Sequence, residues 1–498
     1  MAQTAKLSPK MKKDVIHTII AVCIYIIIGH LLPYKEPLTK EGIQLLGIFV
    51  MTIYLWTTVS TFWPSVLAVF MLGTTGYTSG TNALKECFGH GMTVFVAFML
   101  IFNVAMNESG FSRRIALFFV TRKFVKGKPW LIMFMLMFSV WFVSLFVTSS
   151  AVYAMFLSIA DEMLEMTGYN DDDDLPEAVY CAMMWIDNVG QGSTPMSHTN
   201  VLLGMSMALT LFGYEVPFMT VCWVGIISCL VMFILVFLEF RFLQRPNVQK
   251  MKDLDIDALR ATIPPASKRE KAVAIAFIIL IIMWVFPETI QKIPGLYGFG
   301  TMLKNLGTYA PPLLLVAALC IIPVEGKPVL NLPEACKKIN WGAWGMMAAL
   351  MGMATFLGKS DYGVMPWLTE VFGGFVGNLG ISGNAMAIIT IALIGIQTNF
   401  MSNTASATMF NAYAPIIVAL GGGNPIAAAM CAGMICNAGN ILPSACPIAG
   451  LCNSLPQVRM SYNIRYGAVA TVLCIIVAIL VAYPLYSAVC PVVTQMVG

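Results

Sequence analysis

The chain has 498 residues, of which 58% are apolar and only 11% are charged, and its mean hydropathy is +0.79. Ordinary soluble proteins carry about 25% charged residues, so this composition excludes a soluble globular protein and predicts a polytopic membrane protein. The net charge of +4 is too small to indicate a nucleic-acid partner. The 13 cysteines form no paired Cys-x-x-Cys motif, which argues against a disulfide scaffold or a zinc site.

The first apolar run, residues 15–32, follows several lysines. It is too long for the apolar part of a signal peptide and lacks a small-residue cleavage site, so we expect it to be retained as a span. A helix crosses the bilayer with about 20 apolar residues. Further spans are therefore predicted at 43–60, 62–78, 93–112, 176–213, 217–240, 270–288, 308–323, 342–358, 424–452 and 464–490. The expected fold class is an all-α polytopic membrane protein with about eleven transmembrane helices.

Two further apolar stretches, 130–160 and 384–420, have small and hydroxyl residues at their middle. Each is long enough to enter the membrane and return, so we expect two re-entrant helical hairpins. With the N-terminus cytoplasmic and the C-terminus outside, only six of the 29 basic residues lie outside, in agreement with the positive-inside rule. We therefore expect a multi-pass protein of the plasma membrane.

The two halves of the chain repeat the same order of features. Each hairpin stretch is followed by an apolar span that small residues and proline interrupt, at Gly190–Pro195 and at Asn437–Pro443. The predicted topology gives the two units opposite orientations. Inverted repeats with broken spans at matching positions are typical of secondary transporters, whose binding site lies at the repeat interface near the membrane midplane. The alternative is that these small residues only allow close helix packing.

The repeat predicts a division of the chain into five parts. Scaffold helices of the first repeat occupy 1–128, and its transport part, with the hairpin and the broken helix, occupies 129–245. A cytoplasmic basic linker covers 246–269. The second repeat has scaffold helices at 270–380 and a transport part at 381–498.

The middles of the two hairpin stretches align. The alignment superposes Thr148-Ser149-Ser150 on Ser402-Asn403-Thr404, and Ser144 on Thr398. Where a helix begins just after such a turn, its free N–H groups favour an anionic group. Carbonyl and hydroxyl oxygens on the entering side suit a monovalent cation. Two such tips facing each other would hold the two ends of a small dianion.

These residues resemble the divalent anion/sodium symporter family, in which a Ser-Asn-Thr triplet marks the tip of each of two opposed hairpins. Ser402-Asn403-Thr404-Ala405 matches the triplet fully. The segment 107–116 resembles the family's segment before its first hairpin, and residues 190–200 resemble its first helix break. The likeness extends over about residues 40–490 and therefore over nearly the whole chain.

The resemblance implies a homodimeric elevator transporter that takes up di- and tricarboxylates or sulfate with Na⁺, or exchanges them. The predicted substrate-binding residues are Ser149, Ser150, Asn403, Thr404, Thr194, Pro195, Pro443 and His198. The implied cation-site residues are Thr398, Ser402 and Asn403 at the second tip, and Ser144, Thr148, Gly190 and Gly192 at the first.

The first tip departs from the family pattern, because Ser149 stands where the family has an asparagine. A serine hydroxyl is shorter than an amide and cannot donate and accept at two points as an amide does. The resemblance therefore supports one sodium site better than two and shifts the expectation toward exchange or proton coupling. The second break, which reads Pro443-Ser444-Ala445-Cys446-Pro447, also lacks the family's closing Pro-Pro-Asn.

Two ionisable residues flank the first break, Asp187 before it and His198 after it. A charge at membrane depth is costly and marks an ion or substrate path by default. Asp187 is a coupling candidate that would carry a proton or pair with a cationic group of the substrate, and His198 would lie near a carboxylate. The alternative for each is a hydrogen-bonded residue that only helps the helices to pack.

The predicted function is a carrier of small dicarboxylates such as succinate, fumarate or malate, by exchange or cation-coupled symport. One alternative is a substrate with an amine that Asp187 binds. Another is a channel, which would need a continuous polar lining and would show no saturation. An enzyme is not expected, since the sequence has no metal-ligand spacing, nucleophile elbow or phosphate loop.

Overall fold

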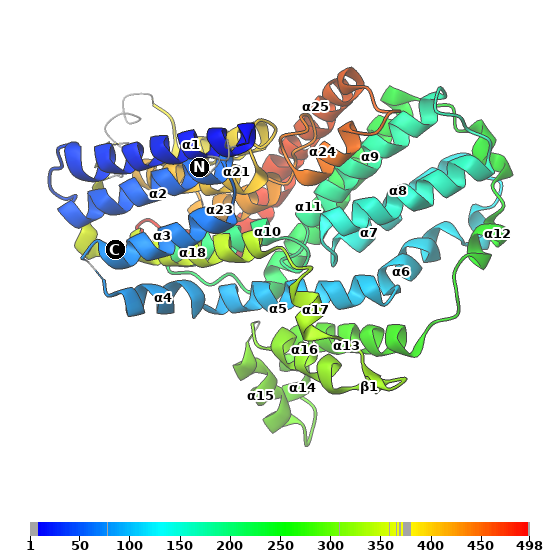
Figure 1. The fold of residues 1–498 in the computed structure, drawn as a ribbon, viewed down its shortest axis with the longest axis horizontal. Coiled ribbons are helices and arrows are strands. Elements are labelled where there is room, and N and C mark those ends of the chain that lie inside the picture. Colours follow the sequence, from blue (N-terminus) through cyan, green and yellow to red (C-terminus); the bar gives the residue numbers. More distant parts are fainter. Residues whose placement is uncertain are drawn as a thin grey trace, which may run out of the picture.

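Long apolar runs bounded by capping residues, glycine and proline determine where the helices of this chain begin and end. The computed structural model describes residues 8–76, 78–307, 309–357, 359–364, 366–367, 370–371 and 380–496. Within these ranges the chain is helical apart from loops and one small antiparallel hairpin, β1 (Pro323–Val324) with β2 (Lys327–Pro328). Figure 1 shows the helices as one elongated assembly.

The first part of the chain forms helices that flank the hairpins. They are α1 (Pro9–Ile26), its π-helical continuation η1 (Ile27–Leu31), α2 (Lys40–Thr58), α3 (Phe62–Thr74), α4 (Gly80–Phe88), α5 (Gly91–Glu108), α6 (Phe111–Val120) and the 3₁₀ turn η2 (Lys123–Val125). The sequence predicts most of these helices, but not α4. This short helix buries only Ala83 and Cys87, too few apolar residues to stand out from a loop.

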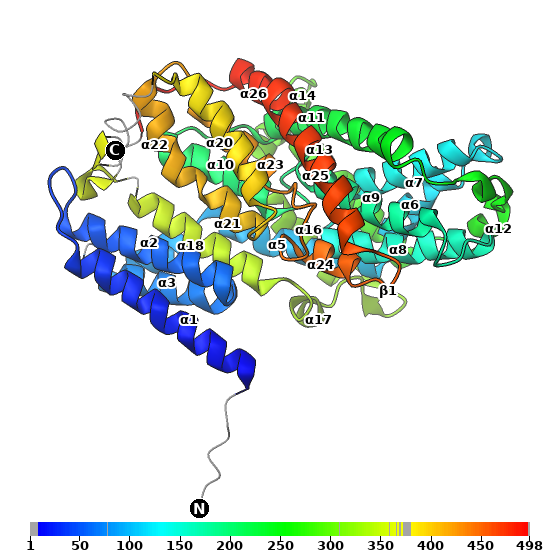
Figure 2. The same ribbon diagram turned by 90° about the horizontal axis from the view of Figure 1, so that it is seen from above.

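The two predicted hairpins are present as antiparallel helix pairs. The first consists of α7 (Pro129–Ser144) and α8 (Ser149–Met166), and the second of α20 (Gly383–Gln397), α21 (Asn403–Thr408) and α22 (Phe410–Leu420). Figures 1 and 2 place them toward opposite ends of the long axis. Their re-entry into the membrane from opposite sides stays a prediction.

Each hairpin is followed by a helix that stops and restarts, as the glycine and proline residues indicate. In the first repeat α9 (Asp174–Gln191) ends before the first break and α10 (Thr199–Phe212) resumes after it. In the second, α23 (Pro425–Ile435) and α24 (Pro447–Asn453) flank the second break. The spans α11 (Phe218–Glu239) and α25 (Met460–Val477) follow, continued by η3 (Phe240–Gln244) and by η6 (Ala478–Ala482) with α26 (Tyr483–Val489).

The remaining elements lie between η3 and the second hairpin in the chain. They are η4 (Gln249–Asp253), α12 (Ile256–Ala261), α13 (Lys268–Val285), α14 (Pro287–Gln291), α15 (Tyr297–Leu306), α16 (Pro311–Ile321), α17 (Leu332–Cys336), α18 (Trp341–Leu357) and η5 (Ser360–Tyr362). Figure 1 shows α13, α14, α15 and α16 together along its lower edge. The predicted second-repeat scaffold includes residues 372–379, which lie outside the described residues.

The basic linker lies against the acidic loop before α9. Lys250 Nζ donates to Asp173 Oδ2 at 2.8 Å, and the Tyr169 hydroxyl donates to the Asn247 carbonyl at 2.7 Å. The hydrogen bond from Lys250 holds the pKa of the Asp173 carboxyl below its ordinary value. The acidic run Asp171–Asp174 is thus partly tied to the linker.

By length and composition, four helices in the described ranges are able to cross a bilayer: Met11–Leu31, Gly91–Glu108, Phe218–Gln244 and Met460–Val489. The pair Tyr297–Leu306 and Pro311–Ile321, bent by 101°, would make a fifth span. Several other predicted spans are shorter apolar helices, including α3, α10, α18 and α23. The count of about eleven spans therefore stays a prediction.

The two broken helices meet through glycine. α10 packs along α23, and a Cβ atom at Gly433 would lie 2.6 Å from the Asn200 carbonyl oxygen and 2.9 Å from Gly204 Cα. At Gly204 a Cβ atom would lie 2.9 Å from the Ala429 carbonyl oxygen. Backbone atoms cannot move aside as a side chain can, so these glycines set the distance between the two repeats.

We expect Gly433→Ala to lower the thermal unfolding midpoint of the detergent-purified protein, because overpacking costs about 1–3 kcal/mol. Gly298→Ala is the matched control: Gly298 is in helix α15 and has no atom within 4 Å of its Cβ position. That control should leave the midpoint unchanged or raise it. Equal midpoints for the two variants would contradict the close contact between α10 and α23.

Candidate functional site

The second hairpin tip carries the full Ser-Asn-Thr triplet at the start of a helix. Ser402 is the N-cap of α21, with φ −58° and ψ 143°, and its hydroxyl accepts a hydrogen bond from the Ala405 N–H at 3.3 Å. Asn403 is the first residue of the helix and is 6% exposed. Thr398, at the end of α20, is fully buried on the entering side of the same turn.

Oxygen atoms converge on the Asn403 amide. The Thr398 hydroxyl donates to Asn403 Oδ1 at 2.8 Å and also contacts the Cys436 carbonyl at the end of α23. If the amide is rotated, its nitrogen donates to the Cys436 carbonyl at 3.2 Å and to the Ala445 carbonyl at 3.2 Å. The space between Asn403, Thr398 and the two carbonyls thus suits the N–H₂ group of the amide in one orientation. In the other orientation, the amide oxygen, the Thr398 hydroxyl and the two carbonyls offer four oxygens to a cation.

Glycine brings the second break to this cluster. A Cβ atom at Gly439 would lie 2.8 Å from Asn403 Oδ1 and 3.4 Å from the Thr398 carbonyl oxygen. A larger residue at position 439 would therefore fill the space beside the amide.

Asparagine side chains connect the second tip to the first break. The Thr404 hydroxyl donates to Asn200 Oδ1 at 2.9 Å, and Asn200 Nδ2 donates to Asn437 Oδ1 at 2.8 Å. Asn200 and Asn437 are buried and lie just beyond the first break and at the start of the second. The two breaks therefore contact each other through side-chain amides.

A second group of amides holds the backbone of the second break. Asn399 Oδ1 accepts from the N–H groups of Asn440 and Ile441 at 2.9 and 3.0 Å. Asn188 Nδ2, on α9, donates to the Gly439 carbonyl at 3.1 Å and to Asn440 Oδ1 at 3.0 Å. These bonds replace the helical hydrogen bonds that the break removes.

The first tip has the same backbone conformation as the second. Thr148 is the N-cap of α8, with φ −66° and ψ 141°, and Ser149 is the first residue of the helix. Ser149 and Asn403 therefore occupy equivalent positions, as the alignment predicts. Ser144 is the last residue of α7, and Thr398 directly follows the last residue of α20, so the two hydroxyls lie at similar places before the tips.

The first break lies against the end of α7. The Thr194 hydroxyl donates to the Leu145 carbonyl. A Cβ atom at Gly190 would lie 2.5 Å from Ser144 Cβ and 2.9 Å from the Trp141 carbonyl oxygen, so only glycine allows this approach. Gly192 instead packs against Met434 of α23 and Cys229 of α11.

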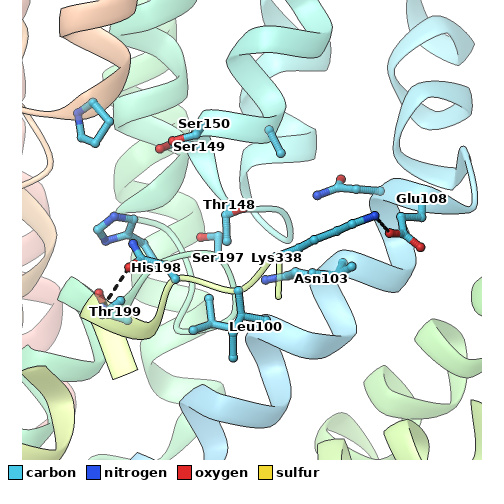
Figure 3. A pocket seen from close by; sticks show the side chains of 17 residues that line it. Leu100, Asn103, Glu108, Thr148, Ser149, Ser150, Ser197, His198, Thr199 and Lys338 are labelled. Atoms are coloured by element: carbon cyan, nitrogen blue, oxygen red, sulfur yellow. Dashed lines mark hydrogen bonds and ion pairs between the residues drawn. The ribbon is translucent and has the colours of Figure 1, made fainter. Parts of the chain in front are cut away.

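A cavity of about 400 Å³ opens at the first tip, a size in the usual range for small-molecule sites. Figure 3 shows the tip residues Thr148, Ser149 and Ser150 and the residues after the first break, Ser197 to Thr199, around it. Asn103 of α5 and Lys338, two residues after α17, also line it. Pro447, which begins α24, also lines it, so both repeats contribute to this cavity.

A charged group beside this cavity, the Lys338 cluster, consists of Lys338, Arg269 and Glu108 and has a net charge of +1. Lys338 Nζ donates to Glu108 Oε1, and Arg269 Nη2 donates to Glu108 Oε2 at 2.8 Å. One carboxylate thus serves two cations, and only Lys338 and Glu108 of these three line the cavity. An anionic ligand is favoured beside such a cluster.

Several predicted site residues lie elsewhere than beside this cavity. Asn403 and Thr404 are not among its lining residues, and Thr404 is joined to it only through Asn200, next to Thr199. Pro195 is buried, whereas Pro443 is exposed at the end of the second break. His198 does line the cavity and caps α10, its Nδ1 accepting from the Asn200 N–H at 3.3 Å.

Asp187 is fully buried on α9 and does not line the cavity. Its Oδ1 accepts from the Ser144 hydroxyl at 2.6 Å.

The sequence does not predict the contacts that Lys338, Asn103 and Asn188 make. Lys338 follows a short helix within a connecting segment, and no motif connects it with the hairpin some 190 residues earlier.

Within the described ranges, no group of three His, Cys, Asp or Glu side chains is placed to hold a metal ion. The groups that converge at the two tips are instead hydroxyls, amides and backbone carbonyls, with the single carboxylate of Asp187. Oxygens of this kind suit a hard cation.

Paired hairpins and paired broken helices, with no strand longer than two residues in the described part of the chain, define an all-α multi-pass membrane transporter. The chain belongs to the family described by the sodium:sulfate symporter transmembrane region, which matches residues 12–490. This is the divalent anion/sodium symporter family that the hairpin residues resemble.

Curated relatives cover most of the chain. The sodium-dependent dicarboxylate transporter SdcS of Staphylococcus saprophyticus is 22% identical over 464 residues, which are 88% of this chain and 86% of the relative. The SdcS protein of Staphylococcus aureus strain USA300 is 21% identical over 467 residues, 88% of this chain and 85% of the relative. Both relatives are transporters, not enzymes.

Two solved structures share the fold. The YdaH transporter of Alcanivorax borkumensis superposes with a TM-score of 0.56 at 15% identity, over 96% of this chain and 98% of its own. MtrF of Neisseria gonorrhoeae superposes with a TM-score of 0.55 at 15% identity, over 96% and 95% of the two chains. At this identity the likeness concerns the fold alone.

We expect Asn399→Ala to destabilise the second break and to lower the thermal unfolding midpoint. The substitution leaves two backbone N–H groups without their acceptor, at about 1–3 kcal/mol for each buried group. Asn453→Ala is the control, because the Asn453 amide donates only to the Ala449 carbonyl of its own helix, at 2.8 Å. A midpoint for Asn399→Ala no lower than that of the control would show that this amide does not hold the break.

Proposed function

We propose that this protein transports small dicarboxylates of the succinate, fumarate and malate class, coupled to sodium. The observation that carries the proposal is the pair of hairpin tips, which have the same backbone conformation at Thr148 and Ser402 and which contact the two helix breaks. The names of the SdcS relatives, sodium-dependent dicarboxylate transporters, support the same substrate and the same ion.

We infer that one carboxylate of the substrate binds at the first tip. The N-terminus of α8, an 18-residue helix, lies at a cavity with Ser149, Ser150 and His198 on its wall. Free N–H groups at a helix start attract an anion, and the Lys338 cluster adds positive charge. The second carboxylate would reach toward Thr404 and Asn200, on the other side of the first break.

We infer that sodium binds at the second tip. Asn403, Thr398 and the carbonyls of Cys436 and Ala445 supply four oxygens when the amide oxygen faces inward. Thr398 and Asn403 would therefore release their mutual hydrogen bond to a bound ion. Such a change couples the ion to the position of Thr404, the neighbour of Asn403.

The further features that we propose rest on the family. The hairpins and broken helices would move together against the scaffold helices, in a homodimer with a cytoplasmic N-terminus. The close packing of α10 along α23 and the contacts of α9 with α24 support a single moving unit, because the two helices of each pair belong to different repeats. An amine-bearing substrate has less support, since Asp187 does not line the cavity.

The function is tested by uptake of labelled succinate into proteoliposomes with and without a sodium gradient. We expect saturable uptake into empty vesicles that requires external sodium. Uptake only into vesicles preloaded with dicarboxylate and indifferent to sodium would establish an exchanger instead. Flux that does not saturate would indicate a channel, and no flux would exclude this class of substrate.

We expect Thr398→Val to raise the sodium concentration for half-maximal uptake by about five- to tenfold, because a ligand or hydrogen bond worth about 1 kcal/mol is lost. Thr390→Val is matched to it. Thr390 is also fully buried on α20, two turns earlier, and its hydroxyl has no hydrogen-bond partner among the described residues. Equal sodium dependence in both variants would exclude Thr398 from the sodium site.

A further inference from the structure

The first tip has Ser149 where the family has an asparagine. A side-chain oxygen of Asp187 nevertheless contacts the Ser144 hydroxyl, at the end of the entering helix. Asp187 of α9 is fully buried, and its Oδ1 accepts from the Ser144 hydroxyl at 2.6 Å. Its other oxygen, Oδ2, has no hydrogen-bond partner within the described part of the chain. A buried carboxylate oxygen left without a partner is costly, so its presence requires an explanation.

The second repeat supplies the comparison. There the hydroxyl of Thr398, at the end of the entering helix, lies 2.8 Å from the side-chain amide of Asn403. In the first repeat the equivalent hydroxyl, Ser144, donates to the carboxylate of Asp187 at 2.6 Å. Asp187 therefore meets the hydroxyl in the way that Asn403 does, although it comes from the broken helix and not from the tip.

Among the described residues, no cation forms an ion pair with this carboxylate. The ion pairs among the described residues do not include Asp187; Glu177, the other buried acid of α9, pairs with Arg459 at 2.6 Å. The ionisable groups that interact electrostatically with Asp187 are Tyr153 of α8 and Cys446, just before α24. Both are neutral near pH 7 in their ordinary state, so neither offsets a negative charge.

Other ionisable groups lie on the helices packed against α9, and none of them makes a hydrogen bond or ion pair with the Asp187 side chain within the described ranges. They are Asp161, Glu162 and Glu165 on α8, Cys222, Cys229 and Glu239 on α11, Arg241 on η3, Cys452 on α24, and Tyr462, Arg465, Tyr466 and Cys474 on α25.

A backbone oxygen lies close to Ser144. The Trp141 carbonyl oxygen is 2.9 Å from the Cβ position of Gly190, one turn beyond Asp187 on α9. The Leu145 N–H donates to the Phe142 carbonyl at 3.3 Å, as expected where the last turn of α7 tightens and leaves carbonyls for other partners. Carboxylate, hydroxyl and carbonyl oxygens are the ligands that hard cations take.

We propose that the Asp187 carboxylate replaces the missing tip amide as a ligand of a sodium ion at the first hairpin, together with Ser144. This inference rests on the proposed function and deepens it, because it restores a second sodium site that the loss of the tip asparagine removes. A full negative charge from the broken helix takes the place of an amide dipole from the tip.

The test is a sodium titration of the thermal unfolding midpoint of the purified protein without substrate, with choline to keep ionic strength constant. An ion that binds only the folded state raises the midpoint with a slope that grows with the number of ions bound. We expect Asp187→Leu, which keeps the branched shape of the side chain and removes both oxygens, to reduce the slope by about half. We expect Asp187→Asn, which keeps one carbonyl oxygen, to retain the slope and to need about tenfold more sodium, because an amide dipole replaces a charge.

The matched control is Glu239→Gln. Glu239 of α11 is also buried, and its Oε2 also has no hydrogen-bond partner among the described residues, but it makes no contact with a hairpin tip that is comparable to the bond between Asp187 and Ser144. The unfolding midpoint of Glu239→Gln should depend on the sodium concentration as that of the wild type does. If Asp187→Leu does not fold, the shift of Asp187→Asn alone supports or contradicts the proposal.

Three results would overturn this inference. A wild-type slope in Asp187→Leu would show that the carboxylate binds no sodium. The same loss in Asp187→Asn and Asp187→Leu would indicate a proton or a packing role, since an amide cannot carry the proton but still offers an oxygen. No effect of sodium on the wild type would overturn the sodium coupling itself, whereas succinate uptake would show separately whether the transport function stands.

Discussion

Two helices stop and restart inside the folded protein, and the polar backbone groups that they expose must be satisfied without water. Asparagine side chains from facing elements supply most of the partners. Asn399 accepts from two N–H groups of the second break, Asn188 donates to its carbonyl at Gly439, and Asn200 joins both breaks to Thr404. Because each amide forms hydrogen bonds with groups on another element, the hairpin tips and the breaks form one connected polar layer.

This layer is nearly symmetric in backbone but not in charge. Thr148 and Ser402 share a conformation, and Ser144 and Thr398 make equivalent hydroxyl contacts. The second tip relies on a neutral amide, whereas the first combines a small serine with a buried carboxylate behind it. On the cavity side, positive charge from the Lys338 cluster complements an anion. The asymmetry would let the two tips contribute differently to ion and substrate binding.

Much of the fold is predictable from the sequence, because apolar run length, glycine and proline act locally. The hairpins, both breaks and the alignment of Ser149 with Asn403 depend on such local signals. The contacts of Asn200 with Asn437 and of Asn188 with Asn440 join residues more than 200 positions apart, so no local pattern contains them. Lys338 lines the cavity from a connecting segment, and Gly192 turns toward α23, and neither follows from the residue types alone.

The central claim is that both hairpin tips bind one dicarboxylate. Equilibrium binding of labelled succinate to the purified protein in sodium, compared between the wild type, Ser149→Ala with Ser150→Ala, and Thr404→Val, tests this claim most directly. We expect one saturable site per chain in the wild type and at least about tenfold weaker binding when either tip is changed, corresponding to about 1.4 kcal/mol. Unchanged affinity after substitution of either tip would contradict a site shared by the two hairpins.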